Sequence, residues 1–160
     1  VCSTNKAGSS HKVIVPAQAY PEQAAHILVA IKERHKPGRL TRGNPGSGPA
    51  RRSISLSGIP TIPYLDRDEY PFASTQEGGL HASVAYINAS QNRGFGACMK
   101  NQLGNYGDAG ALPAGGRFRM VVEQNGRFIQ TNQVTILHTA TVGRSVAWPG
   151  HTPVIISMAN

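Results

Sequence analysis

Residues 64–103 read YLDRDEYPFASTQEGGLHASVAYINASQNRGFGACMKNQL. Four of the eight acidic residues of the chain fall in this stretch, namely Asp66, Asp68, Glu69 and Glu77. The apolar run 82–87 predicts a strand, and residues 91–103 predict a helix whose Gly94 and Gly96 permit close approach of another backbone. We therefore expect strand, turn, strand and helix, with carboxylates leaving the first strand. Such a ββα arrangement can hold one divalent cation between the hairpin and the helix.

Two asparagines of the expected helix are candidate metal ligands. Asn92 and Asn101 are nine positions apart, which is about 2.5 helical turns, so they lie on roughly opposite sides of the helix. They are not expected to bind one metal together, and Asn92 is the better candidate because it is closer to the hairpin. The alternative for Asn92 is a helix N-cap, a position that favours Asn.

The flanking segments predict further helices and strands. Pro21 and Glu22 suit the first turn of a helix that Pro37-Gly38 ends. Asn125-Gly126 is typical of a hairpin turn between strands over 117–123 and 126–137. We also expect strands over 12–15, 142–148 and 154–158, a loop over 43–49, and a short helix or turn over 51–58. These elements predict the α+β class, with a ββα-metal-like core on a small antiparallel sheet, flanking helices and an extra C-terminal β segment.

Composition narrows the class of protein. The chain has 160 residues, 39% of them hydrophobic and 15% charged, with 18 Gly and 11 Pro. This excludes a coiled coil, and the sequence has no apolar run long enough to span a membrane. We expect a single domain over 1–160. The two cysteines match no zinc spacing, so a disulfide and two free thiols both stay open, and the polar first ten residues do not resemble a signal peptide.

The formal net charge is +8, which favours polyanionic partners. Seven basic residues against one acid, Glu33, lie between positions 32 and 52. We interpret them as a sequence-independent phosphate-binding surface, although a solvated face is the alternative. The residues are Lys32, Arg34, Lys36, Arg39, Arg42, Arg51 and Arg52.

The chain resembles the NucA/NucB deoxyribonucleases, which are small extracellular bacterial enzymes. The resemblance rests on segments in matching order: Asp66–Ala73, Glu77–Gly79, Ala82–Val84, Tyr86-Ile87, Asn92–Gly94 and Asn101–Leu103. It covers about residues 12–122 and leaves 123–160 as a C-terminal extension. That family resembles reduced ββα-metal nucleases, which implies a secreted, sequence-nonspecific endonuclease that leaves 5′-phosphates on DNA, and RNA stays open as a second substrate.

The resemblance also implies roles for individual residues. Asp68 would be the general base, and Asn92 would bind a Mg²⁺ or Mn²⁺ ion. Arg67 or Arg93 would hold phosphate oxygens, and Glu69 or Glu77 would contribute to the metal shell directly or through water. The structural alternative is that Asp68 and Glu69 form ion pairs with Arg67 and Arg93 in a turn. His81 is an alternative to Asp68 as the base.

Two other functions stay open. One is the nuclease domain of a delivered antibacterial toxin, which would have a protein inhibitor as its partner. The other is a non-catalytic basic module that binds nucleic acid. In each case we expect a monomer with DNA as the main partner and no membrane association.

Overall fold

The computed structural model describes residues 2, 11–129, 134–139 and 154–158. Its largest sheet is mixed rather than antiparallel, which corrects the expectation from the sequence. β1 (His11–Pro16) runs parallel to β5 (Arg117–Gln124), whereas β2 (Arg39–Thr41) and β6 (Arg127–Ile129) pair with β5 in antiparallel fashion. Three helices, β2 and a two-stranded hairpin lie between β1 and β5 in the chain, and such a long connection is what a parallel pair requires.

The acidic stretch forms a separate two-stranded hairpin. β3 (Leu65–Tyr70) pairs with β4 (Ser83–Asn88), and Asp68 stands opposite Ala85. The carboxylates therefore stand on the first strand itself rather than beyond its end. Because successive side chains of a strand point to opposite faces, Asp66 and Asp68 share one face and Glu69 lies on the other.

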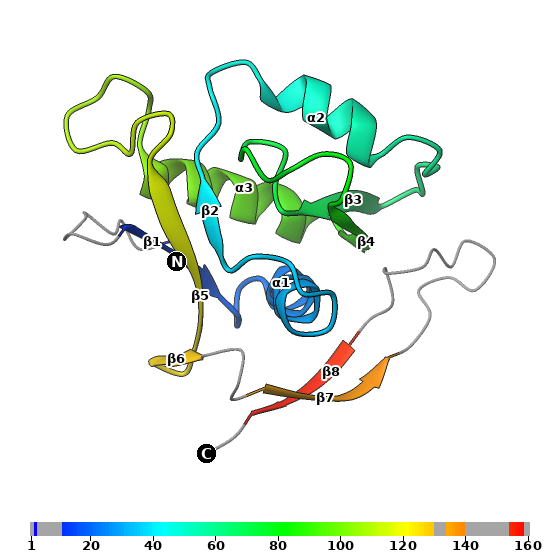
Figure 1. The fold of residues 1–160 in the computed structure, drawn as a ribbon. Helices are drawn as coiled ribbons and strands as arrows, with labels where there is room; N and C mark the ends of the chain where they lie inside the picture. The colour runs from blue at the N-terminus through cyan, green and yellow to red at the C-terminus, as the bar shows by residue number, and fades with distance from the viewer. Residues whose placement is uncertain (1, 3–10, 130–133, 140–153, 159–160) are drawn as a thin grey trace.

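Three helices surround these sheets in the described part of the chain: α1 (Pro21–Lys32), α2 (Gly48–Ser55) and α3 (Ala89–Leu103). α1 packs against β1, the β3–β4 hairpin and α3, and Figure 1 shows it near the centre of the molecule, with α2 above. This position explains why α1 buries polar as well as apolar side chains. α2 begins within the segment expected to be a loop.

α3 begins at a capped terminus. The side chain of Asn88 accepts a hydrogen bond from the amide of Gln91 at 3.1 Å, so Asn88 is the N-cap and Asn92 is released from that alternative role. At Gly94 an added Cβ would stand 2.9 Å from the ring of Tyr20, whereas at Gly96 it would meet no atom within 4 Å. The close neighbour of Gly94 is thus a side chain, not the backbone that we expected.

The main core joins the large sheet, α1 and α3. Phe95 of α3 contacts Phe72 and Tyr20, and Tyr70 packs edge-on against Phe72. A smaller cluster of Ile59, Val84 and Tyr86 covers the other face of the hairpin. The hairpin is therefore held on both faces, and this fixes the carboxylates of β3 in place.

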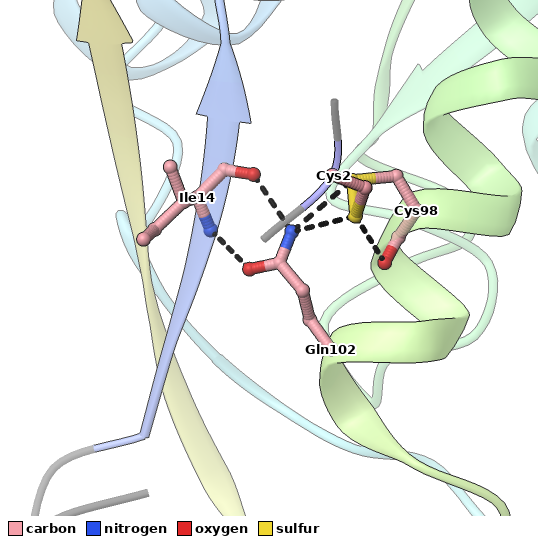
Figure 2. The surroundings of a disulfide bond; sticks show 4 residues. All are labelled: Cys2, Ile14, Cys98 and Gln102. Atoms are coloured by element: carbon pink, nitrogen blue, oxygen red, sulfur yellow. Dashed lines mark hydrogen bonds between the residues drawn. A yellow bond between two sulfur atoms is a disulfide. The ribbon is translucent and has the colours of Figure 1, made fainter. Parts of the chain in front are cut away.

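A disulfide between Cys2 and Cys98 ties the N-terminal segment to α3 across 96 positions. Next to it, Gln102 joins α3 to β1: its Oε1 accepts from the amide of Ile14 at 2.7 Å, and its Nε2 donates to the carbonyl of Ile14 at 2.8 Å (Figure 2). A cross-link that closes a loop of this size stabilises a fold by about 3–5 kcal/mol. α3 is thus anchored firmly at its C-terminal half.

The C-terminal residues add a further antiparallel pair of strands. β7 (Val134–Thr139) and β8 (Val154–Met158) are antiparallel, and β8 lies against α1 (Figure 1). The strand expected over 142–148 lies outside the described residues. Among the described residues, no helix is both long and apolar enough to cross a membrane.

Candidate active site

A cavity of about 430 Å³ opens where β3, α3 and the first turn of α1 meet. Five residues singled out from the sequence for catalysis or metal binding line it, and Phe72, Phe95 and Met99 are among its apolar walls. The polar lining consists of Gln23, Arg52, Thr61, Asp66, Arg67, Asp68, Glu69, Ser74, Asn92 and Arg93. Residues up to 76 positions apart in the sequence, Gln23 and Met99, therefore meet around one cavity.

Asp68 is a buried carboxylate of the cavity, with 5% of its surface exposed. Its Oδ2 accepts from Gln23 Nε2 at 2.8 Å and lies 2.5 Å from His26 Nδ1. Its Oδ1 has no hydrogen-bond partner among the described residues. One oxygen is thus anchored, and the other keeps its full capacity to accept a proton or a hydrogen bond.

His26 extends this anchor by one residue. Because a carboxylate only accepts hydrogen bonds, Nδ1 carries the proton that faces Asp68. Nε2 lies 3.1 Å from the hydroxyl of Ser83, which donates to Nε2 when the ring is neutral. The chain Ser83–His26–Asp68 fixes the orientation of the carboxylate from the neighbouring strand.

Asp66 organises the outer side of the cavity. It accepts two hydrogen bonds from Arg93, at 3.1 and 3.0 Å, and one from Asn92 Nδ2 at 3.2 Å. Burial alone would raise the pKa of Asp66, but these hydrogen bonds outweigh it and lower the pKa below its ordinary value. The Asn92 amide therefore presents its nitrogen to Asp66, which leaves its Oδ1 available to another partner.

Glu69 lies on the opposite face of β3 and has a different partner. Its Oε1 is 3.3 Å from Arg52 Nε, and the Arg52 side chain is 63% exposed. Burial raises the pKa of Glu69, and Arg52 opposes part of that rise. The Arg67 guanidinium donates to the carbonyl of Ile59 at 2.7 Å. Asp68 and Glu69 do not pair with Arg67 or Arg93 as the turn alternative required; Arg93 binds Asp66 instead.

Several expected site residues lie elsewhere. Glu77 is not in the cavity lining, and its carboxylate binds the backbone amide and hydroxyl of Thr41 at 2.9 and 2.7 Å. His81 is exposed and is also absent from the lining. Of the seven basic residues of the expected phosphate surface, Arg52 alone lines the cavity.

The other six basic residues divide into two groups. Lys32, at the C-terminal end of α1, is about 14 Å along the helix axis from Gln23, and Arg34, Lys36 and Arg39 follow it in the chain. Arg42 is buried, and Arg51 bonds Ser47 and the carbonyl of Ala73. The basic run is therefore not one continuous surface beside the cavity.

Gln23 and His26 are site residues that the sequence did not reveal. They are three positions apart on α1, so they lie on one face of the helix, yet no rule of spacing links them to a carboxylate 42 or 45 positions later. The available signal was a pair of polar residues inside the apolar stripe of a helix. Buried polar side chains of this kind need partners.

Comparison with known proteins identifies the family. The family model for deoxyribonuclease NucA/NucB matches residues 25–121, which is more than half of the chain. The chain belongs to the NucA/NucB family. The matched part includes His26, Asp68 and Asn92, whereas Gln23 precedes it and β6, β7 and β8 follow it.

One relative is the DNA-entry nuclease of Bacillus subtilis (strain 168), which is 40% identical over 93 residues. That alignment covers 58% of this chain and 62% of the relative. The chain therefore matches somewhat less than two thirds of the length of this relative.

The cavity is rich in oxygen atoms and can hold a divalent cation that is bound by one or two protein side chains. Among the described residues, no group of three or more His, Cys, Asp or Glu side chains is arranged to hold a metal. The available donors are amide and carboxylate oxygens, which suit Mg²⁺ or Mn²⁺, and Mg²⁺ commonly keeps several waters and binds one or two protein groups together with substrate phosphates. The side chains present are compatible with such a hydrated ion.

Proposed function

We propose that this chain is a metal-dependent, sequence-nonspecific endodeoxyribonuclease that hydrolyses DNA to 5′-phosphate products. The observation that carries the proposal is the carboxylate of Asp68, anchored through Oδ2 and open at Oδ1, in a cavity that also holds three arginines. This is the arrangement that phosphodiester hydrolysis needs: a base for water beside positive groups for the phosphate. Membership of a deoxyribonuclease family supports DNA as the substrate.

In the proposed reaction Asp68 takes a proton from water through Oδ1, and the water oxygen attacks phosphorus. Gln23 and His26 hold Oδ2, so the carboxylate does not rotate away during the transfer. Arg93, whose guanidinium is exposed, and Arg67 bind the non-bridging oxygens. Asn92 would hold the metal through Oδ1, in the orientation that Asp66 sets, and the ion supplies positive charge for the phosphorane and the leaving 3′ oxygen.

The succession β3, β4 and α3 supports a ββα-metal-like core, since α3 packs on the hairpin that carries Asp68. Glu77 has no part in this site because Thr41 occupies its carboxylate. The disulfide supports a secreted protein, because such bonds persist in oxidising compartments. Arg52 and Arg93 are exposed cations of the cavity lining that would contact phosphates, and contacts to phosphate carry no base information.

Plasmid cleavage by the purified chain tests the proposal, with Mg²⁺, with Mn²⁺ and with EDTA. Cleavage should need the metal, and Asp68→Asn should lower the rate by about 10²–10⁴-fold, the usual contribution of a positioned base. DNA affinity of the variant should stay at the wild-type value. Glu77→Gln is the matched control, because it removes a carboxylate of the same acidic stretch outside the cavity.

Two outcomes would contradict the proposal. Cleavage that survives in Asp68→Asn would remove Asp68 from the role of base. DNA binding without cleavage under every metal tried would favour the non-catalytic binding module instead.

A further inference from the structure

Gln23 has a buried acceptor that the fold does not satisfy. The side chain stands in the first turn of α1, is 0% exposed and lines the cavity. Its Nε2 donates to Asp68, but its Oε1 has no hydrogen-bond partner in the described part of the chain. An unpaired buried carbonyl costs about 1–3 kcal/mol, so a residue that retains one at the edge of a reactive cavity calls for a ligand.

The orientation of the amide is fixed by its neighbour. A carboxylate offers acceptors only, so the NH₂ group must face Asp68, and a flipped amide would bring two acceptors together. Oε1 is therefore held on the other side of the amide as an acceptor that needs a donor. The other polar group on this face of α1 does not supply one, because His26 is bonded to Asp68 and Ser83.

We propose that Gln23 Oε1 and Asp68 Oδ1 together hold the attacking water, which makes Gln23 a catalytic residue. This inference rests on the nuclease function proposed above. The water donates one hydrogen to each oxygen, and this leaves a lone pair of the water oxygen directed at the phosphate. As the new P–O bond forms, the water proton that faces Asp68 Oδ1 moves to that oxygen, the hydrogen that faces Gln23 Oε1 stays on the nucleophile, and the P–O3′ bond breaks. The 3′ oxygen takes a proton from solvent.

This role is not supplied by family membership. The family match begins at residue 25, two positions beyond Gln23. The same amide also donates to the base, so one side chain aligns both partners of the proton transfer. A misplacement of about 1 Å at such a point can cost about 10²-fold in rate.

The test separates a defect in positioning the attacking water from a defect in stabilising the leaving group, by comparing two substrates with different leaving groups. Gln23→Met keeps the shape of the side chain but removes the Oε1 acceptor together with the Nε2 donor to Asp68, with Gln76→Met, an exposed glutamine, as the control. Steady-state kcat and KM are measured on DNA and on a thymidine phosphodiester with a p-nitrophenolate leaving group. Because either substrate needs the water, we expect kcat to fall by about 10²-fold on both, with KM and the Mn²⁺ concentration for half-maximal rate unchanged.

Asn92→Ala provides the contrast. The decrease in kcat caused by Asn92→Ala should be smaller on the p-nitrophenyl substrate than on DNA, because p-nitrophenolate needs little stabilisation as a leaving group. A Gln23→Met enzyme that keeps kcat within about threefold of wild type, or that loses activity on DNA alone, would overturn the inference. If Gln23→Met does not fold, as judged by circular dichroism, Gln23→Asn withdraws the acceptor by one carbon and should show the same loss. A wild-type chain that does not cut DNA would instead reject the underlying function.

Discussion

Asp68 and Arg42 are both buried charged residues, yet their surroundings differ in one decisive respect. Arg42 donates to the carbonyls of Leu103, Gly104 and Leu112 and stacks on Tyr106 with its guanidinium carbon 3.8 Å from the ring centroid. Asp68 keeps an oxygen without a hydrogen-bond partner in the part of the chain that the structure describes. The first residue uses its hydrogen-bonding capacity to join loops, and the second retains part of its capacity for a ligand.

The same contrast separates the acidic residues of the stretch 66–77. Glu77 has both oxygens bonded to Thr41, so it fixes the end of β2. Beside Asp68, Gln23 likewise keeps a free acceptor. A polar residue whose hydrogen-bonding groups are all bonded within the protein belongs to the scaffold. A polar residue that keeps an unbonded acceptor beside a cavity belongs to the site.

The largest effect that tests this contrast is expected at Arg42. Arg42→Ala leaves up to three carbonyls near the loop 104–112 without their donor, and each buried one costs about 1–3 kcal/mol. We expect the free energy of unfolding to fall by about 3–5 kcal/mol in a urea titration. Arg52→Ala should lower it by less, because the Arg52 side chain is 63% exposed and its attraction to Glu69 is partly screened by solvent.

DNA affinity should be affected more by Arg52→Ala than by Arg42→Ala, which is the reverse of the order expected for stability. Arg52→Ala should weaken binding and reduce its salt dependence, whereas folded Arg42→Ala should bind as the wild type does. If Arg42→Ala is as stable as Arg52→Ala, saturation of a buried charge does not identify a scaffold residue in this protein.

This contrast also explains what the sequence could and could not predict. Local patterns predicted α1, α3, β4 and β5 within a few residues, because helical spacing, Pro21 and the Asn125-Gly126 turn act over short distances. The motif placed Asp68, Asn92, Arg67 and Arg93 at one site, and the structure brings them together. The sequence could not show that Arg42 is buried and Arg52 is exposed, because this difference depends on which carbonyls surround each side chain after folding. Gln23 and His26 were missed for the same reason.

The next largest effect is expected on kcat at His26, a positioning residue that acts through Asp68. His26→Leu removes one of two donors to Oδ2 and should lower kcat by about 10–100-fold, as is usual for groups that orient a reactive ligand. KM for DNA should not change. His26→Asn should restore much of the rate, because its amide nitrogen can replace Nδ1 as the donor. A loss in His26→Leu that Asn does not repair would indicate that His26 only fills space in the core.

The smallest effect concerns the exposed side of the site, where Asp66 joins Arg93 and Asn92. The pKa of Asp66 is lowered in the folded chain, so the ionised carboxylate stabilises the fold above its ordinary pKa, and this contribution is lost as the pH falls through the folded value. Asp66→Asn should therefore lower Tm by about 1–2 °C at pH 7, because exposed ion pairs contribute little. Thermal unfolding from pH 7 to pH 2.5 should show the two Tm curves converging below the ordinary value of 3.8.

Arg93→Gln should reproduce this pH dependence, and the double variant should lose no more than either single one, because both changes remove the same pair. Curves that stay parallel into acid would mean that Asp66 contributes through packing rather than charge. In that case its orientation of the Asn92 amide could not be attributed to the carboxylate. The outer side of the cavity would then belong with the saturated junction at Arg42 rather than with the site at Asp68.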